Sequence, residues 1–219
     1  MIFRQPEPLT ASHDTSLFDC GKAPLNQFLQ RYALVNQANG SARTFVSLSG
    51  GQISGYFSLA AASAEQAAAS SRVSKGLARH PIPMLLLARL AVDLKAQGNG
   101  LVLGLGRSLL QSALGKYLQA SEVIGAKALM VHAIDEAAIG FYQSFGFEPS
   151  PVDGLDGATC QSGLDPKFIK RLMARAYPDE PPNPYCRVKR EAPSRHPHLP
   201  GRQRNSRGFL HLLWLAFCG

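Results

Sequence analysis

The feature that most constrains the fold is an apolar segment followed by a glycine-rich loop and a helix. Residues 84–92 are almost uninterrupted apolar side chains, which predicts a strand buried on both faces. The glycines between residues 98 and 106 would let backbone N–H groups approach a ligand closely. A helix beginning between Leu101 and Gly106 would direct its free N–H groups and the positive end of its dipole at the same point. The pattern predicts an anion site, although a glycine-rich turn that binds nothing is equally compatible with it.

The surroundings of this loop exclude two common nucleotide-binding signatures. No Gly-Lys-Ser/Thr follows, as a Walker loop requires, and no acidic residue ends a strand about 20 residues later, as a dinucleotide fold requires. Instead, residues 127–133 predict a strand and residues 135–145 a helix. One face of that helix carries Ala138, Phe141, Tyr142 and Phe145.

The first half of the chain predicts a helix, a hairpin and a second helix. Residues 44–48 and 52–59 are β-rich runs on either side of a Gly-Gly pair, which favours a hairpin. Residues 60–70 are rich in alanine and predict a helix. The earlier helix has a proline, Pro24, at its first position and one apolar stripe formed by Leu25, Phe28, Leu29, Tyr32 and Val35.

Several short motifs point to one family when they are taken together. They are Phe-Asp-Cys-Gly at 18–21, Gly-Tyr-Phe-Ser-Leu at 55–59, Arg-His-Pro-Ile-Pro at 79–83, Arg-Leu-Ala-Val-Asp at 89–93 and Phe-Tyr-Gln-Ser-Phe-Gly-Phe at 141–147. With them the chain resembles the GCN5-related N-acetyltransferases (GNAT), and more narrowly the acetyltransferase toxins of type II toxin-antitoxin systems. The resemblance covers roughly residues 5–153. It implies an α/β (mixed α+β) fold with a central mixed sheet flanked by helices, in a domain of residues 1–156.

The resemblance implies acetyl-CoA as the acetyl donor. In the family, one strand splays from its neighbour and offers backbone N–H groups to the pantetheine and the thioester, while the pyrophosphate lies on the glycine loop. The loop departs from the family pattern Gln/Arg-x-x-Gly-x-Gly/Ala, because Val102 stands at the last position and residues 103–106 repeat the end of the motif. Either register could bind the pyrophosphate. The implied cofactor-binding residues are Leu90, Ala91, Val92, Gln97, Gly98, Asn99, Gly100, Leu101, Val102, Gly104, Leu105, Gly106, Arg107 and Phe141.

The implied catalytic residue is Tyr142, which matches the tyrosine that protonates the departing coenzyme A thiolate in the family. His132 lies in an apolar strand and is expected to be a packed, hydrogen-bonded side chain, and His80 matches no known base. Asp93 and Asp135 are expected to cap local structure. Without a strong base, an appreciable fraction of the acceptor amine must be neutral near pH 7 without assistance. The α-amine of an aminoacyl ester is less basic than a lysine side chain, which favours aminoacyl-tRNA as the acceptor.

The basic residues are divided between the predicted domain and the end of the chain. Residues 158–219 carry 11 Lys or Arg against 4 Asp or Glu, so most of the net charge of +8 lies there. Within the domain, a basic cluster at 72–80 is either a solvated linker or a site for tRNA phosphates. The predicted tRNA-binding residues are Arg43, Arg72, Lys75, Arg79 and Arg89.

The region 157–219 has no counterpart in the family. No alternating strand is apparent in it, and its Arg, His and Pro content predicts a poorly ordered tail. Such an ending is either a genuine basic extension or the product of an altered reading frame. The apolar residues 208–219 are too few to span a bilayer, which needs about 20.

The sequence as a whole therefore predicts a cytoplasmic acetyl-CoA-dependent toxin that acetylates the amino group of aminoacyl-tRNA. No leader-like apolar segment begins the chain, and its four cysteines lack metal-ligand spacing, so no metal is expected. The expected partners are aminoacyl-tRNA, a ribbon-helix-helix antitoxin and a possible second copy, with no membrane. Two alternatives stay open: a small-molecule or protein N-acetyltransferase, and an inactive protein that only binds an antitoxin or nucleic acid.

Overall fold

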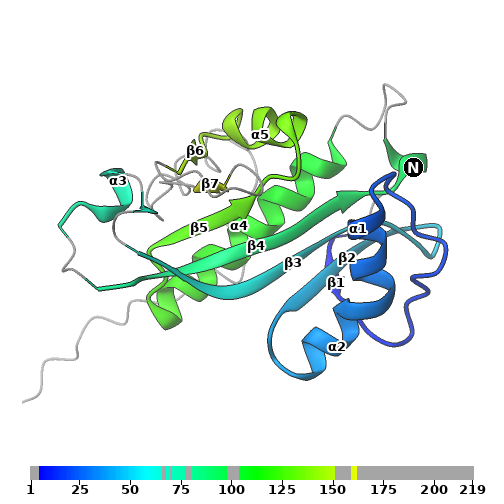
Figure 1. Cartoon of the computed structure of the whole chain (residues 1–219). Coiled ribbons are helices and arrows are strands. Elements are labelled where there is room, and N and C mark those ends of the chain that lie inside the picture. The colour runs from blue at the N-terminus through cyan, green and yellow to red at the C-terminus, as the bar shows by residue number, and fades with distance from the viewer. Residues whose placement is uncertain are drawn as a thin grey trace, which may run out of the picture. The chain divides into compact units, whose positions relative to one another are not determined.

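The fold is built around a seven-stranded sheet of order β1-β2-β3-β4-β5-β7-β6 (Figure 1). The computed structural model describes residues 5–65, 68–69, 71–76, 80–97, 104–150 and 159–161. β4 and β5 pair in parallel, and every other pair is antiparallel. The strands are β1 (Glu7–Pro8), β2 (Arg43–Ser49), β3 (Gln52–Ala64), β4 (Ile82–Val92), β5 (Ala128–His132), β6 (Glu148–Pro149) and β7 (Thr159–Gln161).

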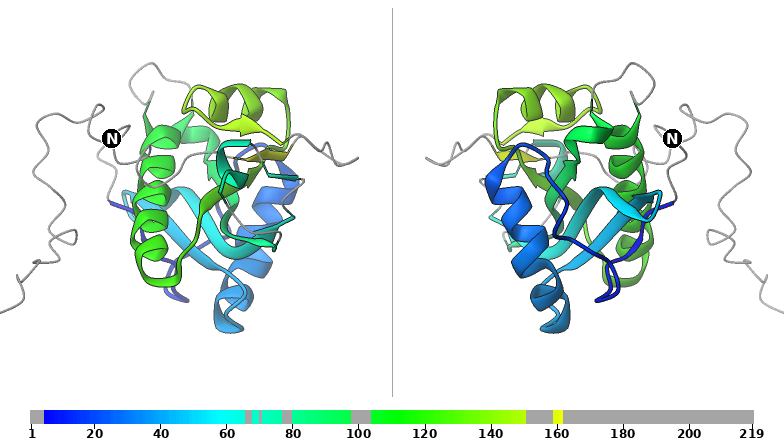
Figure 2. Two further views of the ribbon diagram at one scale, coloured as in Figure 1. Left: turned by 90° about the vertical axis from the view of Figure 1, so that its left-hand side faces the viewer. Right: turned by 90° about the vertical axis from the view of Figure 1, so that its right-hand side faces the viewer.

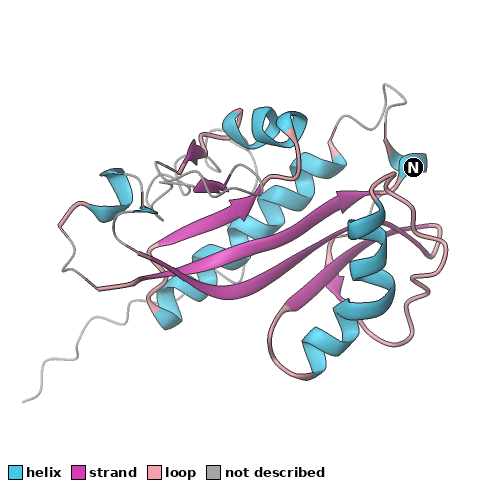
Figure 3. Cartoon of the chain, viewed as in Figure 1, coloured by secondary structure: helices cyan, strands magenta, loops and turns pink. Residues whose placement is uncertain are grey.

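Helices cover both faces of the sheet (Figures 2 and 3). On one face the long helix α4 buries residues such as Leu109, Leu110 and Leu114 against β3, β4 and β5. On the other face, α1 and the turn after it pack Phe28 and Leu29 against the sheet. The helices are α1 (Ala23–Gln27), α2 (Ala33–Ala38), α3 (Ser71–Ser74), α4 (Leu105–Ile124) and α5 (Glu136–Gln143). This arrangement confirms the predicted mixed α/β fold.

The predicted hairpin is confirmed. Ser49 pairs with Gln52, so Gly50 and Gly51 form the two-residue turn between β2 and β3. Both glycines have positive φ, at 59° and 81°. A two-residue turn of this kind matches the twist of the paired strands, and glycine adopts it without strain.

The apolar stripe predicted for the first helix is only partly correct. The helix begins with Pro24 in its first turn, as expected, but residues Phe28–Tyr32 form a π-helical turn before α2. A π turn holds more residues than an α turn, so it rotates the following residues around the helix axis. Phe28, Leu29 and Ala33 are therefore buried, whereas Tyr32 and Val35 are exposed.

The helix predicted for residues 60–70 is wrong over its first part. β3 continues to Ala64, and its alanines pair with the start of β4, where Ala60 lies opposite Leu86 and Ala64 opposite Ile82. Alanine favours a helix in isolation, but the pairing with β4 decides the conformation here.

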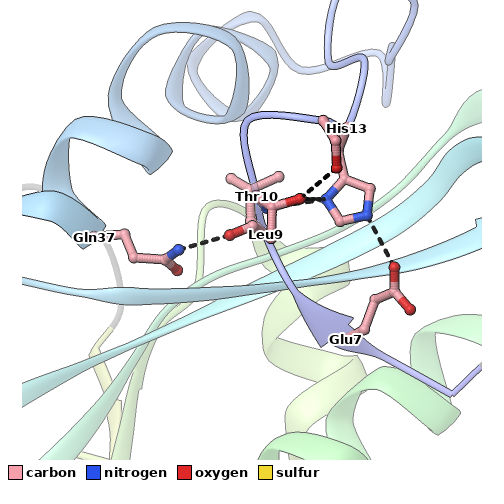
Figure 4. Close-up of polar contacts among 6 residues, drawn as sticks. Glu7, Leu9, Thr10, His13 and Gln37 are labelled. Carbon is pink, nitrogen blue, oxygen red and sulfur yellow. Dashed lines mark hydrogen bonds and ion pairs between the residues drawn. The ribbon is translucent and has the colours of Figure 1, made fainter.

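The N-terminal strand is fixed by a polar network that links β1 to the following loop (Figure 4). The backbone N–H of Thr10 donates to Nδ1 of His13 at 3.0 Å, and Nε2 of His13 lies 2.9 Å from a carboxylate oxygen of Glu7. The side-chain amide of Gln37 donates to the carbonyl oxygen of Leu9 at 2.6 Å, which attaches α2 to the same segment.

A short strand follows residue 156, contrary to the expectation that none would. Thr159–Gln161 form β7, which pairs antiparallel with both β5 and β6 and so completes the sheet. The other predictions for residues 162–219 lie outside the described residues. The boundary between a domain of residues 1–156 and a tail of 157–219 stays a prediction. In the part of the chain that is described, no helix combines the length and apolar character needed to cross a membrane.

Candidate active site

The candidate site begins at an open edge of strand β4. β4 pairs with β3 from Ile82 opposite Ala64 to Val92 opposite Gly55, with a bulge at Ala88. Its pairing with β5 ends at Leu87 opposite Val131. Among the described residues, no strand pairs with Ala88–Val92 on the β5 side, and Figure 1 shows β4 running on past the end of β5. This is the divergence that the resemblance implies around Leu90, Ala91 and Val92.

The first turn of α4 lies beside this open edge. The helix begins at Leu105, with Gly104 as its N-cap, inside the predicted range. A Cβ atom placed on Gly106 would lie 3.8 Å from Cγ2 of Val92 and 3.9 Å from Cζ of Phe141. Three predicted cofactor-binding residues, on β4, α4 and α5, therefore meet at one point. The free N–H groups of a helix N-terminus favour an anion there.

The two predicted loop registers cannot be compared in the structure. Gly98, Asn99, Gly100, Leu101 and Val102 lie outside the described residues. Gln97 is described, and its side-chain amide donates to the carbonyl oxygens of Val92, at 2.5 Å, and Cys20, at 3.3 Å. Its side chain thus fixes the start of the loop to the end of β4.

A glycine that was not singled out as a site residue lets α4 approach the sheet. A Cβ atom on Gly55 would lie 2.8 Å from Cδ1 of Leu109 and 3.1 Å from the carbonyl oxygen of Ala91. Any other residue would force the Leu109 side chain to move and would crowd the carbonyl oxygen of Ala91. The signal in the sequence was a lone glycine inside a β-rich run, which is typical of a close approach by another segment.

Helix α5 supplies the predicted catalytic residue. Asp135 caps the helix by accepting from the backbone N–H of Ala138 at 2.9 Å, as predicted. Tyr142 is 6% exposed and belongs to the same buried cluster as Leu105 in the first turn of α4. Its ring centroid lies 5.2 Å from that of Phe141 and 5.5 Å from that of Phe147. The structure thus places Tyr142 in the layer between α5 and α4.

Arg107 attaches α4 to the turn that follows α5. Its guanidinium carbon lies 5.0 Å from the centroid of the Phe145 ring, in a cation–π contact. Its backbone belongs to the exposed first turn of α4, where it was predicted to bind the cofactor.

The end of β4 is anchored by Asp93, which has the structural role that was predicted. Its buried carboxylate accepts from the backbone N–H groups of Lys95, at 2.9 Å, and Asp19, at 3.0 Å. The loop that contains Asp19 also contains Lys22, whose ammonium lies 3.0 Å from a carboxylate oxygen of Asp135. The N–H of Ala138 and then Lys22 hold the pKa of Asp135 below its usual range. These contacts join the chain around the ends of β4 and β5.

His132, His80 and Cys20 have no part in the candidate site. His132 is exposed at the end of β5, so the prediction that it is packed in the interior is wrong. His80 is exposed as well. Cys20 is buried, and its thiol donates to a side-chain oxygen of Asn26 at 3.1 Å. Burial raises the pKa of the Cys20 thiol, which makes it a poor nucleophile.

The predicted tRNA-binding residues do not form a single patch. Arg89 lies on the face covered by α1, with its guanidinium carbon 5.2 Å from the centroid of the Phe28 ring. Arg43 lines a groove beside α4, on the opposite face. Lys75 is exposed after α3, whereas the side chain of Arg72 and all of Arg79 lie outside the described residues.

Comparison with known proteins gives a consistent result, although no family model matches. The chain is 39% identical over 153 residues to a tRNA-acetylating toxin of Mycobacterium tuberculosis H37Rv, covering 70% of this chain and 89% of that protein. It is also similar to the toxin AtaT complexed with acetyl-methionyl-tRNAfMet, with a TM-score of 0.67, 31% identity and coverage of 78% of this chain and 99% of that one.

A second structure of AtaT shows the same similarity. It is a tyrosine-to-phenylalanine variant bound to the C-terminus of the antitoxin AtaR and to acetyl-CoA. The TM-score is 0.63 at 30% identity, and the match covers 80% of this chain and 99% of that one. The sheet order, the open edge of β4 and these similarities agree, and the chain belongs to the family of tRNA-acetylating toxins, which have the GNAT fold.

Proposed function

We propose that this protein is a cytoplasmic toxin that transfers the acetyl group of acetyl-CoA to the amino group of an aminoacyl-tRNA and so blocks translation. The observation that supports this most strongly is the unpaired edge of β4 from Ala88 to Val92, beside the first turn of α4. The tRNA-acetylating relative and the acetyl-methionyl-tRNA complex of AtaT support the choice of acceptor.

The open edge of β4 and the N-terminus of α4 would bind different parts of the cofactor. The backbone of Leu90, Ala91 and Val92 would hold the pantetheine arm and orient the thioester carbonyl. The N-terminus of α4, with the segment from Gln97 to Arg107, would hold the pyrophosphate, because free N–H groups and the helix dipole both favour negative charge. Phe141 would cover one side of the arm, since it lies against Gly106.

Acetyl transfer would proceed by attack of the neutral amine on the thioester carbon. The tetrahedral oxyanion would form next to the β4 backbone N–H groups, which stabilise the developing charge. As the carbon–sulfur bond breaks, the Tyr142 hydroxyl would give its proton to the thiolate, and the new ammonium would lose its proton to solvent. Solved variants of AtaT in which a tyrosine is replaced by phenylalanine are consistent with such a role for a tyrosine.

The acceptor would approach from the face of the sheet that carries Arg89. Arg89 lies on the open part of β4, exposed beside Phe28, where it could contact the acceptor end of the tRNA. Arg72, Lys75 and Arg79 would bind phosphates of the tRNA. Arg43 lies on the other face and is not part of this surface.

The partner that controls the toxin would be a ribbon-helix-helix antitoxin. AtaT has been solved with the C-terminus of its antitoxin AtaR, which supports an antitoxin for this chain too. A second copy of the chain is a further expected partner.

The direct test is acetylation of defined acceptors with radiolabelled acetyl-CoA. Charged tRNA should gain label, whereas uncharged tRNA, free amino acids and protein lysines should not. Reversing the charge of Arg72, Lys75 and Arg79 together should weaken the use of tRNA and lower its salt dependence by roughly one unit of slope per lost phosphate contact.

Two results would overturn the proposal in different ways. Ready acetylation of a small amine or a protein, with no label in charged tRNA, would favour the broader acetyltransferase alternative. Absence of acetyl-CoA binding by the folded protein, measured by titration calorimetry, would favour a chain that only binds an antitoxin or nucleic acid.

A further inference from the structure

A second concave surface lies beside the C-terminal half of α4, away from the candidate active site. It is a groove of about 530 Å³ between α4 and the strands β2, β3 and β4. Phe45, Leu59 and Leu85 contribute apolar side chains from the sheet, and Ala120 contributes from the helix. At 1.5 Å per residue, Lys116 lies about 16 Å along α4 from the first turn at Leu105. The groove is therefore distinct from the cofactor site.

The rim of this groove exposes large apolar side chains at the end of α4. Val123 is 84% exposed and Ile124 is 63% exposed, and both line the groove. Exposed apolar side chains that adjoin an apolar groove mark a surface covered by another molecule. A small molecule would normally be enclosed in a pocket, whereas an open groove edged by a helix suits an extended or helical peptide.

The charges on the groove are of one sign. Arg43 and Lys116 line it, and no aspartate or glutamate is among the described residues of its lining. The Lys116 ammonium lies 4.5 Å from the centroid of the Phe45 ring, directly over the apolar side chains. Among the described residues, neither Arg43 nor Lys116 forms a salt bridge. Both cations are thus available to a carboxylate-bearing partner.

We propose that this groove binds an acidic, amphipathic segment of a partner protein. Its apolar side chains would cover Phe45, Ala120 and the exposed end of α4, and its carboxylates would meet Arg43 and Lys116. This inference does not depend on acetyl transfer, because the residues of the groove take no part in the proposed chemistry.

Charge argues against two other occupants. The C-terminal residues 158–219 carry 11 Lys or Arg against 4 Asp or Glu, so they would be repelled by the same cations. A second copy that used the same patch in a two-fold contact would bring Arg43 and Lys116 close to their own counterparts. A nucleic acid would satisfy the charges but would leave Val123 and Ile124 uncovered.

The test is a selection of displayed random peptides of about 16 residues on the immobilised full-length protein. The selected peptides should be rich in aspartate and glutamate, with apolar side chains at helical or alternating spacing. Synthetic copies, followed by fluorescence anisotropy, should lose at least about tenfold in affinity for Gln119→Trp, which fills the groove from an exposed position, and for Arg43→Glu with Lys116→Glu.

The matched control is Arg31→Glu, an exposed reversal on the turn that packs on the opposite face. It should leave affinity for the selected peptides within about twofold, because that position is remote from the groove. Peptides with lysine in place of their acidic residues should bind the Arg43→Glu, Lys116→Glu variant better than the parent protein. This exchange of preference would show that the reversed variant is folded.

Several results would overturn the inference. Selection of no peptide, selection of basic peptides, or binding that is unchanged by the groove variants would each show that the groove takes no acidic segment. A dimer in sedimentation that becomes a monomer in Gln119→Trp would identify a second copy as the occupant. Loss of charged-tRNA binding in the double reversal, with unchanged peptide affinity, would identify nucleic acid.

Discussion

The two halves of strand β4 differ in what borders them, although they are similar in composition. From Met84 to Leu87 the strand is held between β3 and β5. Beyond a bulge at Ala88, residues Arg89 to Val92 pair only with β3 among the described strands. Leu87 is 1% exposed in the paired half, while Leu90 is only partly buried in the open half. The same type of apolar strand therefore serves as core in one half and as a candidate ligand surface in the other.

The difference arises from the neighbouring strand and not from β4 itself. β5 ends at His132 and the chain turns into α5, so the later part of β4 loses its partner. Gly55 allows α4 to lie close to the open half. A function in one half of β4 and a purely structural role in the other should therefore be separable by substitution.

The largest expected effect is on catalysis at the open half. Tyr142→Phe keeps the ring but removes the proposed proton donor, so turnover of acetyl-CoA with charged tRNA should fall about 100-fold to 10,000-fold. Affinity for acetyl-CoA, measured by calorimetry, should be nearly unchanged. If the variant acetylates as fast as the parent, Tyr142 is a packing residue and another group protonates the thiolate.

The next effect compares stability between the two halves. Leu87→Ala should lower the free energy of unfolding by about 2–5 kcal/mol, because it leaves a cavity in the core. Leu90→Ala removes a partly buried side chain and should lower it by roughly 1 kcal/mol.

Acetyl-CoA should stabilise the two variants unequally when the same urea titrations are repeated. At about 100 times its dissociation constant the cofactor should add about 2.7 kcal/mol to the parent and to Leu87→Ala, but less to Leu90→Ala. Equal stabilisation of both variants would contradict the proposal that only the open half of β4 binds the cofactor.

A smaller effect compares two glycines of α4. A Cβ on Gly106 meets Val92 and Phe141 at ordinary contact distance, so Gly106→Leu should extend into the space proposed for the cofactor. Its affinity for acetyl-CoA should fall about tenfold. Gly115 has nothing within 4 Å of such a Cβ, and Gly115→Ala should stabilise the helix by about 1 kcal/mol without changing affinity. Calorimetry and thermal unfolding of both variants would test this, and equal loss of affinity would contradict it.

The smallest effect concerns the pH dependence of stability at the start of α5. The pKa of Asp135 is lowered in the folded protein. The ionised carboxylate therefore contributes to folding stability above its pKa in the unfolded chain, about 3.9, and this contribution is lost as the pH falls through its pKa in the folded protein. Asp135→Asn should keep the cap and remove this dependence, whereas Asp135→Ala should lose both. Urea midpoints measured between pH 2 and pH 7 would check this, and an unchanged pH profile in Asp135→Asn would contradict it.

Elements with their own local signals were predictable from the sequence. The Gly-Gly turn, the apolar β4, the start of α4 and the Asp135 cap are each specified by residues within the element. The candidate site was predicted because its motifs lie in such elements.

The errors have in common that distant residues decide the local structure. The alanines of β3 are strand because β4 lies alongside, and β7 has only three residues, whose partners lie on β5 and β6. His132 is exposed because β5 ends there. Arg43 and Arg89 lie apart because their side chains project from opposite faces of the sheet. The face of each residue is set by strand pairing across the whole domain.

The central claim is that the open half of β4 binds acetyl-CoA, and amide hydrogen exchange along β4 tests it most directly. With saturating acetyl-CoA, those amides of Ala88–Val92 that do not bond to β3 should become strongly protected. The amides of Met84–Leu87, which lie between β3 and β5, should change little. Bound acetyl-CoA without new protection in Ala88–Val92, or with its protection confined to another surface, would contradict the account.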